Sequence, residues 1–269
     1  MKRLFAICLL LIIIFPTTAF SSTVLDFFKD TTNNLSIPVI TYHLISDESN
    51  KWSDFCISPQ KLEEDFKLLK ANGYNAISVS ELLNIYKNPK LIDKYKNSVV
   101  LTSDDGYASD FKYILPLMQQ YNIKFNFFVV GGFIDTPWYL TSGEIIQMSA
   151  NNLVEFGNHS SLLHGLNSDK LREMYRNSSN NEFFLNDFMR ANDILTRLTK
   201  KIPCSLSYPY GEYSNSIDIA LKKKGFSLRF TTAGGTAFPI GGITNIGRIN
   251  RSNSLSSVEL IKIIGSPFR

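Results

Sequence analysis

Cysteine and histidine are scarce in this sequence, and neither sign of charge dominates. Three cysteines are present, and Cys8 lies near the N-terminus, so a disulfide scaffold is excluded and at most one bridge, Cys56 to Cys204, is possible. The formal net charge is +4, which falls to +2 if Lys2 and Arg3 are removed with the leading segment. So small an excess gives no argument for binding nucleic acid or an anionic membrane surface.

The long hydrophobic run is confined to the N-terminus. In residues 1–22, two basic residues precede an apolar run over 4–15, and a proline and small residues follow. This is the layout of a secretory signal peptide, with cleavage expected after Ala19 or Ser21. The run is too short to span a bilayer comfortably, which takes about 20 residues, although an uncleaved anchor is the alternative. We expect a protein exported to the periplasm, the cell envelope or the medium; association with the membrane or envelope stays open.

The rest of the chain, residues 23–269, has the pattern of one α/β domain. Hydrophobic residues make up 44% of the sequence and charged residues 19%, as in globular proteins. Strand and helix patterns alternate about seven times, which predicts a parallel sheet, either a barrel or a doubly wound fold. We expect strands at 37–43, 76–79, 98–103, 124–130, 153–159, 204–211, 228–235 and 243–250. We expect helices after Ser58, at 81–86, around 111–118 with Pro116 delaying or kinking it, after Thr141, over 184–198, before Gly225 and after Ser256.

Polar side chains follow the expected strands at the point where each strand ends. Among them are all three histidines of the chain, which fall at or just after such ends. Because sites in parallel α/β folds gather at the carboxyl ends of the strands, these side chains are expected to lie close together. They are His43, Asp104, Asp105, His159, His164, Tyr208 and Tyr210.

Two histidines and a carboxylate are a common ligand set for Zn²⁺ or a similar divalent cation. His159 and His164 are five residues apart and would not share a helix face, but on a loop they can converge. The carboxylate would come from Asp104 or Asp105, and the other would stay free as a base. Taken singly, each pattern is also compatible with an ordinary turn, since Asp-Asp-Gly favours one.

Three motifs over residues 36–250 make the chain resemble the polysaccharide deacetylases, also called NodB-like domains or carbohydrate esterase family 4. The first, (T/S)FDDG, is present as TSDDG at 102–106, and the second, H(S/T)xxH, as HSSLLH at 159–164. The third, RxPYG, is present as SYPYG at 207–211. The longer second motif is similar to the branch that acts on poly-β-1,6-N-acetylglucosamine.

The resemblance implies a distorted (β/α) barrel and metal-dependent N-deacetylation. By motif position, Asp105, His159 and His164 would hold the cation, with Zn²⁺ expected first and Co²⁺, Ni²⁺ or Fe²⁺ as alternatives. Asp104 would be the general base. The backbone N–H of Tyr210 would stabilise the tetrahedral oxyanion.

Two departures from the family pattern matter. The arginine of the third motif is Ser207 here, so Arg248, or else Arg229, would supply the charge partner of Asp104. No histidine follows His164, so His43 is the imidazole left to protonate the leaving amine, unless it is only structural. Because the site has few groups that can donate this proton, slow turnover is expected.

The expected partner is a polysaccharide, first of all poly-β-1,6-N-acetylglucosamine, with peptidoglycan or chitin oligomers as alternatives. Tyr208, Trp138 and Arg248 are expected to bind it, and Trp52 and Tyr139 lie in loops on the same side. Two other hypotheses remain: a carbohydrate-binding relative that has lost catalysis, and a glycosidase that uses Asp104 and a second carboxylate. The glycosidase leaves the histidine pair without a role.

Overall fold

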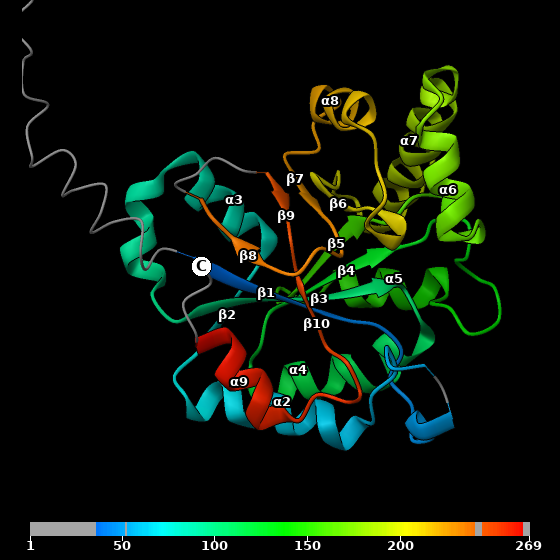
Figure 1. Ribbon diagram of the computed structural model, residues 1–269. Coiled ribbons are helices and arrows are strands. Elements are labelled where there is room, and N and C mark those ends of the chain that lie inside the picture. Colours follow the sequence, from blue (N-terminus) through cyan, green and yellow to red (C-terminus); the bar gives the residue numbers. More distant parts are fainter. Residues whose placement is uncertain (1–35, 52, 240–243, 266–269) are drawn as a thin grey trace, which may run out of the picture. The chain divides into compact units, whose positions relative to one another are not determined.

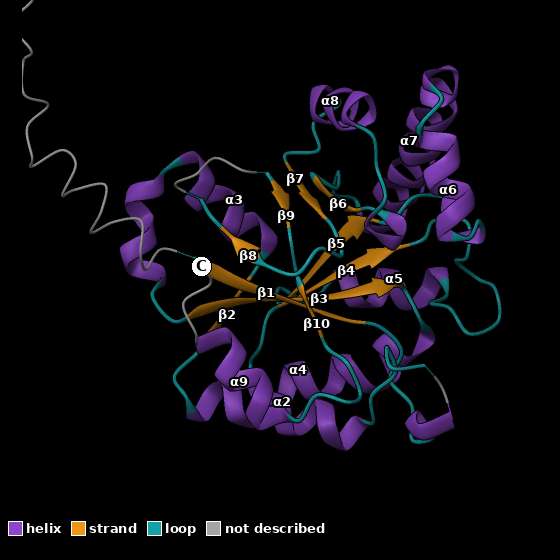
Figure 2. Cartoon of the chain, viewed as in Figure 1, coloured by secondary structure: helices purple, strands orange, loops and turns teal. Residues whose placement is uncertain are grey.

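A sheet of mostly parallel strands forms the centre of the computed structural model, with helices around it (Figures 1 and 2). The structure describes residues 36–51, 53–239 and 244–265. The expected signal peptide at 1–22, the first residues of the domain expected over 23–269, and Trp52 lie outside the described residues.

The sheet is barrel-like because its two ends are joined by a very short piece of chain. The strand order is β10-β1-β3-β4-β5-β6-β7-β9, so β9 and β10 lie at opposite ends, yet only Gly247 and Arg248 separate them in sequence. The expected barrel is confirmed, and the doubly wound alternative is wrong. The strands are β1 (Ile37–Tyr42), β2 (Asn75–Ile77), β3 (Ser98–Asp105), β4 (Phe125–Val129), β5 (Val154–Asn158), β6 (Ser205–Ser207), β7 (Leu228–Phe230), β8 (Thr236–Ala237), β9 (Asn245–Ile246) and β10 (Ile249–Asn250).

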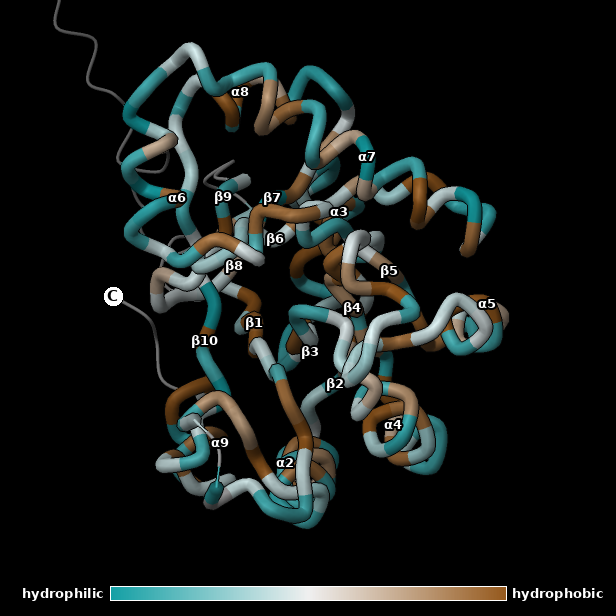
Figure 3. Tube along the Cα trace, turned by 90° about the vertical axis from the view of Figure 1, so that its right-hand side faces the viewer, coloured by the Kyte–Doolittle hydropathy of each residue, from teal (hydrophilic) through white to brown (hydrophobic). Residues whose placement is uncertain are grey.

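Residues far apart in sequence build the sheet in parallel register. Ile40 of β1 pairs with Leu101 of β3 and with Ile249 of β10, and among the described strands only β8 runs antiparallel, against β1. All eight residues of β3 are buried, which explains its unbroken apolar run, since a parallel strand is covered on both faces. Along the helices around the sheet, hydrophilic and hydrophobic residues alternate, as expected for helices with one buried face (Figure 3).

The helices begin where the sequence places caps. Ser58 accepts the N–H of Lys61 at the start of α2, and Thr141 forms the expected capping box with Glu144 at the start of α5. The helix α6 was not expected from the sequence. The helices are α2 (Pro59–Ala71), α3 (Val79–Lys87), α4 (Leu115–Tyr121), α5 (Ser142–Ser149), α6 (Ser168–Tyr175), α7 (Asn181–Thr199), α8 (Asn215–Lys223) and α9 (Ser257–Gly265).

Two further expectations are settled by local geometry. Pro116 does not delay its helix: the chain is already helical from Ala108, and a π-helical turn, Asp110–Ile114, lies directly before α4 and its proline. The disulfide allowed by the sequence does not form, because Cys56 and Cys204 are both free thiols.

A buried ion pair connects the C-terminal part of the chain to α2, and further hydrogen bonds connect it to β1. The guanidinium of Arg251 donates to both carboxylate oxygens of Asp65, at 2.6 and 3.0 Å, and neither side chain is exposed. The hydroxyl of Tyr42 also donates to Asp65, and the N–H of Arg251 donates to the carbonyl of Thr41. The pair therefore holds β10 in its place beside β1.

Replacing Arg251 with methionine leaves the Asp65 carboxylate buried without its partner. We expect Arg251→Met to lower the free energy of unfolding by about 3–5 kcal/mol, measured by urea denaturation. The double variant Asp65→Leu/Arg251→Met removes both charges and should recover most of that loss. A single variant as stable as the wild type would contradict this account.

Candidate active site

The strand β3 ends on two carboxylates that both face one cavity. Successive strand residues normally point to opposite faces, but Asp105 has a left-handed backbone (φ 75°), which breaks the alternation after Asp104. Gly106 continues the turn with φ 76°, and a Cβ there would lie 2.8 Å from Cγ1 of Val129. The turn therefore requires glycine at 106 and stores strain where the two carboxylates are displayed.

Two imidazoles converge on the Asp105 carboxylate. Nε2 of His159 lies 3.3 Å and Nε2 of His164 lies 3.0 Å from Oδ1 of Asp105. Nδ1 of His159 lies 2.8 Å from the carbonyl oxygen of Ser207, so Nδ1 carries the proton and Nε2 is the nitrogen with a free lone pair. His164 is held by Tyr210, whose ring stacks on the imidazole at 4.8 Å and whose hydroxyl donates to the His164 carbonyl.

These three side chains fit a divalent cation. Oδ1 of Asp105 is buried and accepts no hydrogen bond, and the ligand atoms of the three residues all lie within 4.8 Å of one another. Two atoms that bind one ion at about 2.1 Å lie about 3.0–3.4 Å apart for octahedral to tetrahedral angles, close to the two distances from Asp105. Metal-binding histidines commonly donate their second ring N–H to a carbonyl or carboxylate, which orients the ring. The Ser207 carbonyl accepts from Nδ1 of His159 in this way. The sequence-predicted ligand set is therefore brought together in space.

The second carboxylate, Asp104, is held by Arg248 instead. Nη1 and Nη2 of Arg248 donate to the two oxygens of Asp104, at 2.7 and 2.6 Å, and the Ser207 hydroxyl donates to Asp104 at 2.9 Å. Burial alone would raise the pKa of Asp104, but the charge of Arg248 outweighs it and brings the pKa down to about 2. Asp104 is therefore ionised at neutral pH, with its Oδ2 4.0 Å from Nε2 of His159.

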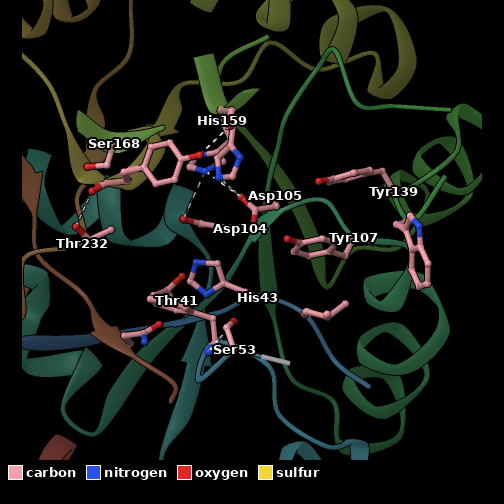
Figure 4. Close-up of a pocket in the computed structure, with 16 residues that line it drawn as sticks. Thr41, His43, Ser53, Asp104, Asp105, Tyr107, Tyr139, His159, Ser168 and Thr232 are labelled. Atoms are coloured by element: carbon pink, nitrogen blue, oxygen red, sulfur yellow. Dashed lines mark hydrogen bonds and ion pairs between the residues drawn. The ribbon is translucent and has the colours of Figure 1, made fainter. Parts of the chain in front are cut away.

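A cavity of about 850 Å³ lies over these groups, at the carboxyl ends of the strands (Figure 4). Its side chains come from β1, the β3 end, the loop after β4 and the loops around the histidines. They are Thr41, His43, Leu44, Ser53, Phe55, Asp104, Asp105, Tyr107, Trp138, Tyr139, His159, His164, Ser168, Tyr210, Thr232 and Asn250. The volume is in the range of sites for small ligands or a few sugar units.

Aromatic side chains and His43 also line the cavity. Trp138 is 70% exposed, and Tyr139 stacks on Tyr107 at 5.2 Å. His43 packs its ring against Phe55, and its Nδ1 is buried without a hydrogen-bond partner. Burial lowers the pKa of His43, with Asp105 and Asp104 acting in the opposite direction, so the imidazole is mainly neutral at neutral pH.

Two residues expected to bind substrate are placed elsewhere. Tyr208 is buried and donates its hydroxyl to Asp218, so it does not line the cavity. Arg248 is also buried, and its guanidinium is occupied by Asp104, so its expected contact with substrate is wrong and its expected charge-partner position is correct. The alternative partner, Arg229, binds Asp218 instead.

Sequence reasoning missed the contribution of Ser207. Its hydroxyl accepts from Nη2 of Arg248 at 2.8 Å and donates to Asp104, so it joins the two charged groups. The sequence signal was the serine at 207 in place of the family arginine. A small side chain there leaves room for an arginine from another part of the sheet. Thr41 and Asn250, neighbours across β1 and β10, were also not expected in the cavity.

Removing a ligand should abolish the response of this site to a divalent cation. For the wild type, Zn²⁺ at 100 times its Kd should stabilise the fold by about 2.7 kcal/mol, seen as a rise in Tm. Asp105→Asn and His164→Ala should lose most of this rise, whereas Asp93→Asn, at an exposed carboxylate, should keep it. An unchanged rise in the ligand variants would exclude the site.

A family model described as polysaccharide deacetylase matches residues 92–228 of the chain, just over half of it. The poly-beta-1,6-N-acetyl-D-glucosamine N-deacetylase of Escherichia coli K12 is 23% identical over 230 residues, which cover 74% of this chain and 34% of that protein. The protein of the same name from Staphylococcus aureus N315 is 23% identical over 188 residues, covering 68% of this chain and 63% of that one. This chain thus spans only about a third of the Escherichia coli relative.

Solved structures with this fold include three deacetylases. Streptococcus pyogenes deacetylase PplD superposes with a TM-score of 0.75 at 20% identity, covering 87% of this chain and 100% of that one. A de-N-acetylase from Aggregatibacter actinomycetemcomitans gives 0.74 at 24% identity, covering 85% and 99%. IcaB from Ammonifex degensii gives 0.74 at 22% identity, covering 86% and 97%. At these identities the likeness establishes the barrel fold.

Proposed function

We propose that this chain, which belongs to the polysaccharide deacetylase family, hydrolyses acetamide groups of a polysaccharide that contains N-acetylglucosamine and releases acetate. One observation carries the proposal: donor atoms of Asp105, His159 and His164 meet at one point, and the ionised Asp104 lies beside them. A site with these parts can activate water and direct it at an amide carbonyl.

Poly-β-1,6-N-acetylglucosamine is the substrate that we propose first. Support comes from the names of the Escherichia coli and Staphylococcus aureus relatives and from the six-residue motif that runs from His159 to His164. The aromatic rings of Trp138 and Tyr139 at the cavity mouth suit the apolar faces of sugar units. Peptidoglycan and chitin oligomers are the competing substrates. Comparing acetate release from each of these oligomers with that from the β-1,6-linked oligomer distinguishes them.

The chemistry divides between the two carboxylates of β3. A divalent cation at Asp105, His159 and His164, with Zn²⁺ expected first, would supply Lewis acidity that polarises the acetamide carbonyl and makes water more acidic. Asp104 takes the proton of the attacking water. Its low pKa makes it a weak base, so it depends on that increased acidity, while Arg248 and Ser207 hold the carboxylate in position.

Two other groups complete the reaction. We assign the backbone N–H of Tyr210 to the oxyanion, since this residue lines the cavity beside His164 in a left-handed conformation (φ 56°). We assign protonation of the leaving amine to His43, the imidazole of the cavity that is not part of the cluster of Asp105, His159 and His164. Because His43 is mainly neutral, little of its acid form is present at neutral pH, and slow turnover follows.

A relative that binds carbohydrate without catalysis remains the alternative from another class. Two departures from the family pattern suggest it: the serine at 207, where the family motif has arginine, and the absence of a histidine after His164. The ion pair of Arg248 with Asp104 weighs against it, because a different arginine fills the same electrostatic need. That alternative predicts bound oligosaccharide and no acetate.

Export of the chain also remains a proposal, supported by the leading segment at 1–22. It places the protein where extracellular or envelope polysaccharide is present. Among the residues that the structure describes, no helix combines the length and the apolar character needed to cross a bilayer.

Asp104→Asn keeps the shape of the base but removes its ability to accept the water proton. We expect acetate release from a β-1,6-linked N-acetylglucosamine oligomer to fall by a factor of about 10² or more, with metal content unchanged. Wild-type acetate release in this variant would refute the proposed mechanism. Chain shortening without free amines would point to the glycosidase instead.

His43→Gln should slow turnover by a factor of about 10² while metal affinity stays at the wild-type value. As the pH falls from about 8 to about 6, the protonated fraction of His43 grows, so wild-type kcat should rise, and the rise should be absent in the variant. Turnover equal to the wild type at both pH values would remove His43 from the reaction.

A further inference from the structure

The loop that carries both histidines, residues 159–164, is anchored along one side by the β4 end. The N–H of Gly131 donates to the carbonyl of Ser160 at 2.9 Å, and the N–H of Gly132 donates to the carbonyl of Ser161 at 3.0 Å. A Cβ on Gly132 would lie only 2.4 Å from the Ser161 oxygen, so this close approach requires glycine. These bonds satisfy carbonyls of the loop but none of its N–H groups.

Two N–H groups in the middle of the same loop donate to a carboxylate from α7. Oδ1 of Asp187 accepts the N–H of Ser161 at 2.7 Å, and Oδ2 accepts the N–H of Leu162 at 2.9 Å. Asp187 is only 7% exposed, and α7 packs against β5, the strand that leads into the loop (Figure 1). With two hydrogen bonds to one side chain, this contact attaches the middle of the loop to α7.

The middle of the loop sets where the two imidazoles stand relative to each other. His159 is anchored by the Ser207 carbonyl, and His164 by Tyr210. Between them the chain passes through Ser160 in a left-handed conformation (φ 70°), which a loop adopts only when its surroundings hold it there. A loop relaxed at this point would separate the two Nε2 atoms.

We propose that Asp187 is a positioning residue of the metal site: by accepting the N–H groups of Ser161 and Leu162, it holds the loop so that His159 and His164 meet Asp105. The inference rests on the proposed function in one respect, the assignment of these three residues as metal ligands. Asp187 is not among the residues that line the cavity, so it would act through the loop backbone.

The test compares Asp187→Asn with Asp193→Asn. The first keeps the shape of the side chain but places an amide N–H₂ against one of the two loop N–H groups. The second removes the same charge from an exposed position of the same helix. Affinity for Co²⁺ and Zn²⁺ is measured by competition with a chromogenic chelator, together with the visible spectrum of the Co²⁺ protein.

We expect Asp187→Asn to bind both ions about 10–100-fold more weakly, with an altered Co²⁺ spectrum, and Asp193→Asn to stay within about twofold of the wild type. In the metal-free protein, the amides of Ser161 and Leu162 should exchange hydrogen faster in Asp187→Asn only. Wild-type affinity and exchange in Asp187→Asn would overturn the inference while leaving the proposed function intact. A wild type that binds neither ion would instead overturn the metal site on which both rest.

A second variant keeps the test decisive if Asp187→Asn does not fold. Asp187→Glu retains the charge and both acceptor oxygens but moves them one methylene further from α7. The shifted loop should cost at least about threefold in metal affinity, while the amides of Ser161 and Leu162 stay protected. Affinity equal to the wild type in this variant would overturn the inference.

Discussion

The ion pair between Arg248 and Asp104 is the contact on which the rest of the site depends. Arg248 lies between β9 and β10, where the two ends of the sheet come together, and Asp104 lies at the end of β3. The pair therefore joins the closure of the barrel to the orientation of the carboxylate. Breaking such a buried pair leaves an uncompensated charge, which typically costs about 3–5 kcal/mol. The closure of the barrel and the position of the Asp104 carboxylate therefore both depend on this ion pair.

Electrostatics separate two adjacent and chemically identical side chains. Asp104 has an arginine and a serine hydroxyl as partners, so its charge is already neutralised. Asp105 faces two imidazole nitrogens and keeps a buried oxygen without a hydrogen bond, which suits a cation. In the proposed function, surroundings rather than residue type thus give one carboxylate to proton transfer and the other to metal binding. The left-handed turn at Asp105 makes this division possible.

Much of the site could be predicted from the sequence because its residues follow strand ends. Parallel strands bring their carboxyl ends to one edge, so Asp105, His159 and His164 were expected together and do meet. Tyr208 was misplaced, since the motif SYPYG does not reveal which of its tyrosines turns inward to Asp218. The contact of Asp187 with the histidine loop could not be predicted from the sequence either. Nothing in the pattern of α7 distinguishes Asp187 from an acidic residue on the surface.

The sequence alone indicated the alternation of strands and helices except for α6, the caps that begin α2 and α5, and the three side chains of the proposed metal site, because these depend on neighbouring residues. It also limited the partner of Asp104 to two arginines. Tertiary structure decided between them, since Arg248 approaches Asp104 only when the short β9–β10 connection spans the ends of the sheet, while Arg229 is held by Asp218. Pairings across 144 positions are set by topology, which local sequence patterns do not encode.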